Sequence, residues 1–398
     1  MSNTPRRFAS STDAVHAGAP RERPHHALAH EVAQTATYTF ANTAELERYM
    51  RGEDPDTHRE EYGRYGNPTV RELEQRVAEL EGADDAVAFS SGMAATTSVV
   101  FTLLKAGDHI VLFRDCYRRT RQLVTQLLPR FGVEHTVVPP GDLGAMERAL
   151  RDSTRMVISE SPTNPFLYCA ELDRLSQIVR AHGRIRVLVD ATLATPVNVR
   201  PLALGADLVL HSATKYLSGH NDVLGGVVAG PSHLVGLLRE ARGVLGAVLD
   251  PHAAFLIVRG LKTLGLRIER QNATALAVAR ALEGHPKVRR VFYPFLESHP
   301  SHAIAKAQMQ GGGGMVSFIV NGSREEAARV VDRCRIAKIA ASFGGLETLI
   351  EQPAIMSYFE LTDEQLRALE IDPALIRLSV GVEETNDVVE SVLQALGD

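Results

Sequence analysis

Residues 211–226 read His-Ser-Ala-Thr-Lys-Tyr-Leu-Ser-Gly-His-Asn-Asp-Val-Leu-Gly-Gly, and they follow a short apolar run at 207–210. Within this stretch Lys215 has hydroxyl side chains three residues and one residue before it. A second apolar run, at 186–189, lies upstream and leads into Asp190. Both runs are typical of buried strands, and ligands of parallel α/β sheets bind beyond the carboxyl ends of the strands. The pattern therefore predicts that Lys215 and Asp190 lie together at one edge of a mostly parallel sheet.

This amine and this acid are the two groups that pyridoxal phosphate (PLP) requires. A lysine forms a Schiff base with the cofactor, an acid pairs with the pyridinium nitrogen, and small donors hold the phosphate. We predict these roles for Lys215, for Asp190, and for Ser212 with Thr214, respectively. The alternative is a surface lysine that follows a strand, beside hydroxyl groups that cap a helix.

A second candidate for phosphate binding is the segment of Ser91, Gly92 and Met93, which follows an apolar run and opens an expected helix. Amide groups at a helix N-terminus bind anions, and glycine permits a close approach. These residues would complete a phosphate cradle with the hydroxyl groups before Lys215. Simple helix capping explains the same residues equally well.

Two further side chains suggest how a substrate is handled. Tyr117 follows the apolar run 109–113, which we predict as a strand, so its ring can stack on the cofactor and its hydroxyl can carry a proton near the substrate. Arg377 lies in the strand-like run 375–380, where an arginine needs a carboxylate partner. An amino-acid substrate supplies such a carboxylate. The alternatives are an ordinary loop tyrosine and a structural ion pair.

Composition limits the class of protein. The net charge is −5 and no basic block stands out, which argues against nucleic acid as the main partner. Three cysteines without paired spacing indicate no disulfide framework and no zinc site. His25, His26 and His30 match no common metal site and are expected in a solvated arm, so we predict no metal. With neither a signal peptide nor an apolar segment of about 18 residues, we expect a cytoplasmic protein without a membrane partner.

Changes in composition and hydrophobic periodicity along the chain predict three parts. Residues 1–60 read as an extended arm with a short helix at 43–50, residues 61–248 as a large α/β domain, and residues 249–398 as a smaller C-terminal α+β domain. The last part should open with one long helix at 253–282. An extended arm usually needs a partner surface to be ordered, so we expect a homo-oligomer.

Beyond these patterns, the chain resembles the PLP-dependent trans-sulfuration family of cysteine and methionine metabolism. The similar segments cover nearly the whole chain: AVHAG at 14–18, EYGRYGNPT at 61–69, SPTNP at 161–165, the Lys215 segment, RGLKTL at 259–264 and SFGGLET at 342–348. Within the family, the plant-type cystathionine γ-synthases are most similar, through DCYRRT at 115–120 and QPAIMSY at 352–358. The resemblance implies the aspartate-aminotransferase fold (fold type I), an α/β domain with a mostly parallel sheet and a smaller C-terminal α+β domain.

The family also implies an active site shared between subunits. Tyr62 and Arg64 match the family residues that reach the PLP phosphate of the neighbouring subunit. The catalytic unit would then be a homodimer, and the family commonly assembles two dimers into a tetramer.

Substrate-binding roles follow from the same resemblance. Asn164 would contact both the cofactor and the substrate carboxylate, Ser342 and Arg377 would flank that carboxylate, and Glu347 would face the distal part of the substrate. The implied reaction is γ-replacement on an O-activated homoserine, with cysteine giving cystathionine. A γ-lyase, or replacement by a different nucleophile, stays open because these enzymes share their catalytic groups. Leu193 stands where the family usually has phenylalanine, which leaves the acceptor open as well.

Overall fold

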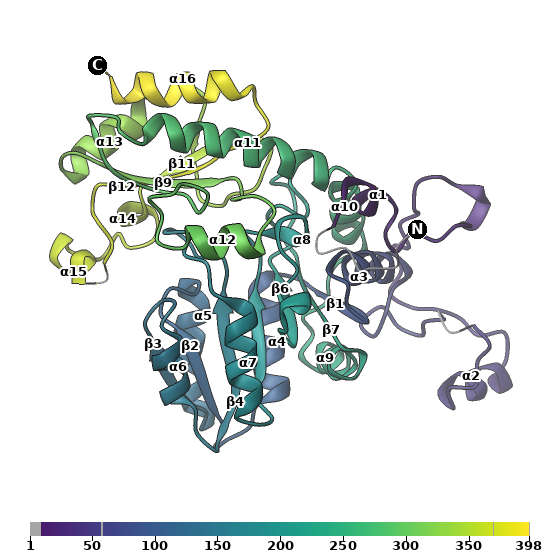
Figure 1. The fold of residues 1–398 in the computed structure, drawn as a ribbon. Helices are drawn as coiled ribbons and strands as arrows, with labels where there is room; N and C mark the ends of the chain where they lie inside the picture. Colours follow the sequence, from purple (N-terminus) through teal and green to yellow (C-terminus); the bar gives the residue numbers. More distant parts are fainter. Residues whose placement is uncertain (1–8, 57–58, 369, 398) are drawn as a thin grey trace.

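The computed structural model describes residues 9–56, 59–368 and 370–397, which fold around two β-sheets (Figure 1). The larger sheet has the strand order β1-β7-β6-β5-β4-β2-β3. Its strands are parallel except for β7, which runs antiparallel to both β1 and β6. The strand bounds are β1 (Asp85–Phe89), β2 (His109–Phe113), β3 (Glu134–Val138), β4 (Thr154–Glu160), β5 (Arg186–Asp190), β6 (Leu208–His211) and β7 (Gly226–Gly230). The predicted mostly parallel sheet is confirmed.

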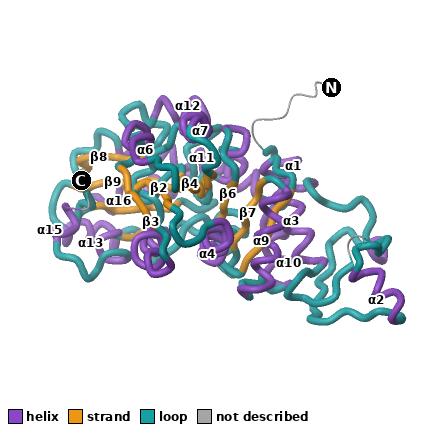
Figure 2. Tube along the Cα trace, turned by 90° about the horizontal axis from the view of Figure 1, so that it is seen from below, coloured by secondary structure: helices purple, strands orange, loops and turns teal. Residues whose placement is uncertain are grey.

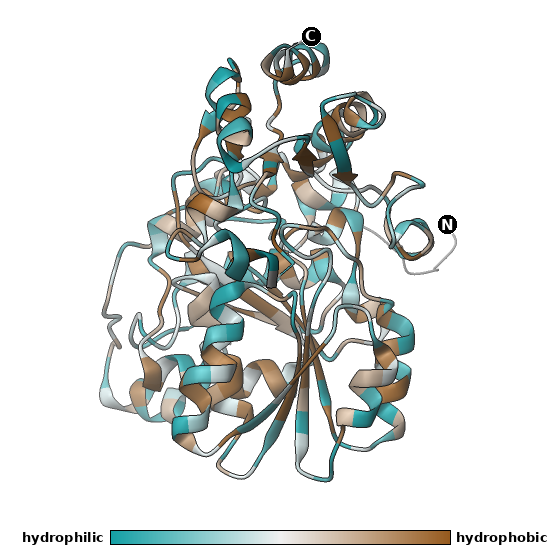
Figure 3. Ribbon diagram, turned by 90° about the vertical axis from the view of Figure 1, so that its left-hand side faces the viewer, coloured by the Kyte–Doolittle hydropathy of each residue, from teal (hydrophilic) through white to brown (hydrophobic). Residues whose placement is uncertain are grey.

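Helices cover both faces of this sheet, so the central parts of its inner strands are mostly apolar (Figure 3). Every residue of β2, for example, is buried. The covering segments are α3 (Pro68–Glu81), α4 (Gly92–Leu103), α5 (Arg118–Gln122), the π-helical turn η2 (Leu123–Leu127), η3 (Leu128–Phe131), α6 (Leu143–Ala149), α7 (Leu172–Ala181), α8 (Thr195–Asn198), η4 (Pro201–Leu204) and α9 (Ser232–Leu245). Helix α3 ends at Gly82, which adopts a left-handed conformation with φ +68°.

The smaller sheet has the strand order β10-β11-β12-β9-β8 and is antiparallel except between β10 and β11. Its strands are β8 (Val288–Phe292), β9 (Met315–Val320), β10 (Lys338–Ile339), β11 (Leu349–Glu351) and β12 (Leu375–Ser379). Helices α11, α13 and α16 lie along it in Figure 1. The helices of this part are α10 (Pro251–Leu261), α11 (Leu264–Leu282), α12 (His302–Gln308), α13 (Arg324–Arg333), α14 (Pro353–Met356), α15 (Asp363–Ala368) and α16 (Thr385–Leu396).

The prediction of one continuous helix at 253–282 is wrong, because the chain breaks it into α10 and α11. The hydroxyl of Thr263 donates to the carbonyl of Gly260 at 3.1 Å and terminates the first helix. Gly260 itself passes so close to Ser218 that a Cβ would lie 2.0 Å from the Ser218 carbonyl oxygen. The break thus lets α10 pack tightly against the segment that follows Lys215.

The N-terminal arm is only partly extended. Helix α1 (Ser11–His16) packs on α3 and α11, whereas α2 (Thr43–Met50) buries no residue and projects away from the body of the chain (Figure 2). Between them lies the short turn η1 (Pro24–His26). His30 was expected in solvent, but it is buried, and its ring stacks on Phe255 with centroids 4.9 Å apart. The position of α2 agrees with the expected helix at 43–50.

The division of the chain at about residues 60 and 248 stays a prediction, although the two sheets fall on either side of the second boundary. Residues 1–8 of the predicted arm lie outside the described residues. In the part of the chain that the structure describes, no helix is long and apolar enough to cross a membrane.

Candidate active site

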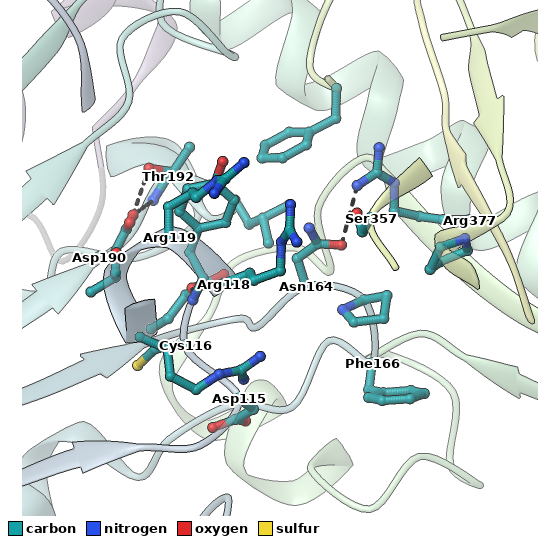
Figure 4. Close-up of a pocket in the computed structure, with 18 of the residues that line it drawn as sticks. Asp115, Cys116, Arg118, Arg119, Asn164, Phe166, Asp190, Thr192, Ser357 and Arg377 are labelled. Carbon is teal, nitrogen blue, oxygen red and sulfur yellow. Dashed lines mark hydrogen bonds between the residues drawn. The ribbon is translucent and has the colours of Figure 1, made fainter. Parts of the chain in front are cut away.

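A cavity of about 1180 Å³ lies beyond the carboxyl ends of β2, β4, β5 and β6, where the large sheet faces the small one. Figure 4 shows part of its wall. The cavity brings together most of the residues that the sequence singled out: Ser91, Gly92, Met93, Tyr117, Asn164, Asp190, Ser212, Thr214, Lys215, Ser342 and Arg377.

Lys215 follows β6, and its amine points across the cavity to the smaller sheet. Its Nζ donates a hydrogen bond to the Ser342 Oγ at 2.8 Å and lies 5.1 Å from the centroid of the Phe343 ring. Burial, assisted by the nearby positive charge of Arg377, lowers the pKa of Lys215 to about 8. A substantial fraction of the amine is therefore neutral near physiological pH, as a base or nucleophile must be.

Asp190 ends β5 and is oriented by a threonine that the sequence analysis did not select. Its Oδ1 accepts hydrogen bonds from the backbone N–H of Thr192 at 3.0 Å and from the Thr192 hydroxyl at 2.5 Å (Figure 4). The same hydroxyl accepts the backbone N–H of Ser212 at 2.8 Å. Burial raises the pKa of Asp190, and among the described residues it has no ion-pair partner. A protonated ring nitrogen would supply the missing positive charge.

The N-terminus of α4 forms one wall of the cavity. Ser91 caps this helix, since its Oγ accepts the backbone N–H of Ala94 at 3.0 Å. Gly92 is the first helical residue, and a Cβ there would lie 2.9 Å from the Cβ of Ser212. This close approach places the amide-rich helix end beside the hydroxyl groups before Lys215. The arrangement suits an anion such as a phosphate.

Tyr117 stands at the start of α5 and is held by a buried carboxyl group. Its backbone N–H donates to the Glu160 Oε2 at 2.6 Å. Burial, reinforced by the negative charge of Asp190, raises the pKa of Glu160 well above its usual range. Glu160 thus fixes the Tyr117 backbone while the tyrosine ring stays at the cavity surface, with 45% of the residue exposed.

Arg377 projects from β12 and is surrounded by acceptors. Its Nη2 donates to the carbonyl of Ser342 at 2.8 Å, and its Nη1 donates to the Asn164 Oδ1 at 3.3 Å (Figure 4). The Glu351 Oε1 lies 2.9 Å from the same Nη1. The structure therefore shows the ion pair that was the alternative prediction for Arg377, and its role in binding a substrate carboxylate stays a prediction.

A group of arginines from the segment after β2 also lines the cavity. Arg118 and Arg119 are drawn in Figure 4, and Arg114 and Arg121 belong to the same lining. Arg118 lies 3.9 Å from the carboxylate of Glu360. Arg119 donates to Gln122 at 2.7 Å and has no carboxylate partner among the described residues. Arg119 therefore offers its positive charge to an anionic ligand in this part of the cavity, whereas Arg114 is paired with Glu370 at 2.7 Å.

Three predicted residues do not line the cavity of their own chain. Tyr62 is 41% exposed, and Arg64 donates to the carbonyl of Gly243 and lies against the rings of Tyr62 and Tyr65. Glu347 accepts a hydrogen bond from Asn221 at 2.8 Å outside the lining. Their roles stay predictions. The first two were expected to act on a neighbouring subunit.

The cavity fits PLP on observations of this chain alone. It offers a partly neutral lysine amine, a buried acid that needs a cation, and a helix N-terminus beside hydroxyl groups. These are the groups that PLP enzymes use for the aldehyde, the ring nitrogen and the phosphate. The fold and the site together define a PLP enzyme of fold type I.

Comparison with known proteins gives the family. Residues 11–397 match the family model described as "Cys/Met metabolism PLP-dependent enzyme". The chain is 48% identical to "Cystathionine gamma-synthase 1, chloroplastic" of Nicotiana tabacum over 371 residues, which is 93% of this chain and 68% of the tobacco protein. It is 39% identical to an L-methionine gamma-lyase of Fusobacterium nucleatum over 98% of both chains.

A solved structure agrees with these relatives. The crystal structure of metB from Corynebacterium glutamicum matches with a TM-score of 0.90 and 37% identity, and the match covers 97% of each chain. The protein belongs to the family of PLP-dependent enzymes of cysteine and methionine metabolism, and PLP is its cofactor. The resemblance, the fold class and the cofactor predicted from the sequence are confirmed.

Proposed function

We propose that this protein catalyses γ-replacement on an O-activated L-homoserine, with cysteine as nucleophile and cystathionine as product. The C–O bond at Cγ breaks, the activating group leaves as its anion, and the cysteine sulfur forms the new bond to Cγ. The observation that carries the proposal is one cavity that holds Lys215, Arg377 and the arginines at 118 and 119 together. This reaction needs a lysine base, a cation that binds the α-carboxylate of the substrate, and a second cationic site for the activating group. The similarity to the tobacco synthase supports the same reading.

We assign one or two residues of the cavity to each step. Arg377 and Asn164 would bind the α-carboxylate and so fix the substrate Cα, because an arginine fork binds a carboxylate in a defined orientation. When bound, PLP supplies an electron sink for cleavage of the bonds at Cα. The Lys215 Nζ would remove the Cα proton, then a Cβ proton, and would return both after the thiol has added. The Tyr117 hydroxyl would share this second transfer, and its place in the lining of the same cavity supports that role.

The arginines after β2 point to an activating group that carries negative charge. Arg119 has no carboxylate partner among the described residues, so its charge is available to a ligand. A phosphoryl or succinyl ester presents an anion at its distal end, whereas an acetyl ester does not. We therefore propose that kcat/KM is higher for the two anionic esters than for O-acetyl-L-homoserine.

The test is a product analysis. Purified protein with PLP is incubated with O-phospho-, O-succinyl- and O-acetyl-L-homoserine, each with and without cysteine, and the products are identified by mass spectrometry. Cystathionine that appears only with cysteine, with little 2-oxobutyrate, supports the proposal and identifies the leaving group. A Lys215→Ala protein that retained activity would contradict the assigned base.

A γ-eliminating lyase is the second candidate, because an L-methionine gamma-lyase matches 98% of this chain. The same lysine and arginine would serve, but no nucleophile would add at Cγ. The γ-substituent would leave, and water would hydrolyse the resulting imine at Cα to 2-oxobutyrate and ammonia. In the product analysis, 2-oxobutyrate that is unaffected by cysteine would favour this lyase. Little consumption of any ester, with or without cysteine, would favour a synthase that uses another nucleophile.

We further propose that the working form is a homodimer within a tetramer, located in the cytoplasm. Tyr62 and Arg64 support the dimer, since both lie outside the cavity of their own chain although their segment matches the family pattern. The three cysteines are free, which suits a reducing compartment. The predicted domain boundaries at about residues 60 and 248 belong to the same proposal.

A further inference from the structure

Glu351 is the carboxylate closest to the proposed substrate-binding arginine. It ends β11 and stands directly opposite Arg377 on β12 in the antiparallel register, so the two side chains share one face of the small sheet. Both line the cavity, and their side chains are only 3% and 7% exposed. The Glu351 Oε1 lies 2.9 Å from the Arg377 Nη1. A buried carboxylate of the chain itself thus contacts the arginine that is proposed to bind the substrate.

Glu351 and Arg377 lie close together, but several of their buried polar atoms lack a hydrogen-bond partner among the described residues. Neither oxygen of Glu351 meets a well-oriented hydrogen-bond donor in the described part of the chain, and the Nε of Arg377 is also buried without an acceptor. Asn164 and the carbonyl of Ser342 take the other donors of the guanidinium. Buried polar atoms normally have partners, so this arrangement leaves bonding capacity on Arg377 that a ligand can use.

We propose that Glu351 competes with the α-carboxylate of the substrate for Arg377, and that it thereby sets how tightly the site binds an amino acid. The inference rests on the proposed function, in which Arg377 receives that carboxylate. With substrate bound, two carboxylates would share one buried guanidinium, and a like charge in such a place is unfavourable. Protonation of Glu351 removes its negative charge and therefore the repulsion between the two carboxylates.

The surroundings of Glu351 support proton uptake. Burial raises its pKa, while Arg377 is the cation that opposes this effect. From the other elements, Arg324 of α13 is engaged with Asp363 at 3.6 Å, and α14 carries no titratable side chain. Lys215 is directed to Ser342 and not to Glu351. Once the substrate shares Arg377, no second cation in the described residues is paired with Glu351.

The test compares ligands that differ only in the carboxylate. L-norvaline and n-butylamine bind through the same amine, and neither has a leaving group at Cγ. Their dissociation constants are measured on the PLP-loaded protein from the absorption of the bound cofactor, and their ratio defines the carboxylate preference. In Glu351→Gln we expect this preference to rise about tenfold, through tighter norvaline binding alone, because the amide keeps the shape and removes the charge.

Two matched variants complete the experiment. Glu351→Asp retains the charge and should keep the preference near the wild-type value, whereas Arg377→Ala should remove it. Suppose that wild type shows the preference, that Arg377→Ala abolishes it, and that Glu351→Gln leaves it unchanged. That result overturns the competition between Glu351 and the substrate carboxylate but leaves the proposed function intact. A wild type without any preference would instead contradict the role of Arg377.

The pH dependence of wild type provides an independent check if Glu351→Gln does not fold. Burial raises the Glu351 pKa above its ordinary value near 4.5, and binding that is coupled to proton uptake becomes tighter as pH falls, so the wild-type preference should rise as the pH is lowered from about 8 to about 5. Effects on the amine and on Lys215 are common to both ligands and cancel in the ratio. A flat or opposite trend overturns the proposal.

Discussion

The Nζ of Lys215 donates a hydrogen bond to the Oγ of Ser342 across 2.8 Å, and this contact joins the large sheet to the small one over the cavity. Ser342 has φ +82°, a left-handed conformation that costs a residue with a side chain about 1–3 kcal/mol. The strained backbone also turns the Ser342 carbonyl to the Nη2 of Arg377 at 2.8 Å. One residue therefore positions the lysine through its side chain and the arginine through its backbone.

Replacement of Ser342 separates these two roles. Ser342→Ala removes the hydroxyl and keeps the carbonyl, so we expect kcat to fall about tenfold while KM for the homoserine ester changes little. Steady-state kinetics measure the two constants. Ser317→Ala is the matched control, because this buried serine of β9 has a hydroxyl without a hydrogen-bond partner. A raised KM with an unchanged kcat would assign Ser342 to substrate binding alone.

The low pKa of Lys215 predicts a pH-dependent reactivity of its amine. The group is charged below its pKa of about 8 and neutral above it. In the protein freed of PLP, modification of Lys215 by an amine-reactive reagent should therefore accelerate about tenfold from pH 7 to pH 9 and then level off. Peptide mass spectrometry resolves this site from other lysines. An ordinary lysine would still accelerate above pH 9, and that outcome would contradict the shifted pKa.

The sequence reveals those parts of the site that lie in local patterns. Lys215 and Asp190 each follow an apolar run, and parallel strands bring such ends to one edge, so their meeting is predictable. Thr192 was missed because its bridge between Asp190 and the Ser212 backbone joins two loops that are distant in sequence. Glu351 was missed because β11 has only three residues, too few for a periodic signal, and its partner is set by the register with β12.

The same distinction applies to the fold. The strand β2 was predicted with correct bounds because all of its residues are apolar or buried. The neighbouring edge strand β3 was not, since most of its positions are partly or fully exposed and polar residues are tolerated there. The break between α10 and α11 lies at Lys262 and Thr263, where the Thr263 hydroxyl donates to the Gly260 carbonyl, and helical periodicity does not reveal such a local hydrogen bond.

The close packing at Gly92 predicts a loss of cofactor affinity in Gly92→Ala. The added Cβ would lie 2.9 Å from the Cβ of Ser212, so the start of α4 must move relative to the hydroxyl groups beside it. We expect the dissociation constant of PLP to rise at least about tenfold in a titration of the cofactor-free protein, since the phosphate depends on this geometry. Gly236→Ala in α9 is the control, because no atom lies within 4 Å of its Cβ. Unchanged PLP binding in Gly92→Ala would remove α4 from the proposed phosphate site.

A mixture of two inactive variants tests whether the active site is shared between subunits. Lys215→Ala lacks the base, and Arg64→Ala lacks the arginine that is proposed to reach the neighbouring subunit, so each variant alone should have little activity. In a mixed dimer, one of the two sites combines an intact Lys215 from one chain with an intact Arg64 from the other. Co-refolded or co-expressed variants should therefore regain up to about a quarter of the wild-type activity, because random pairing makes half of the dimers mixed and each has one good site of two. The measurement is activity per PLP site after the subunits have exchanged.

In wild type the Arg64 guanidinium contacts the carbonyl of Gly243 in its own chain, so a purely structural role for Arg64 predicts no recovery above the sum of the two variants. That result would reject the proposal that Arg64 of one subunit contributes to the active site of the other.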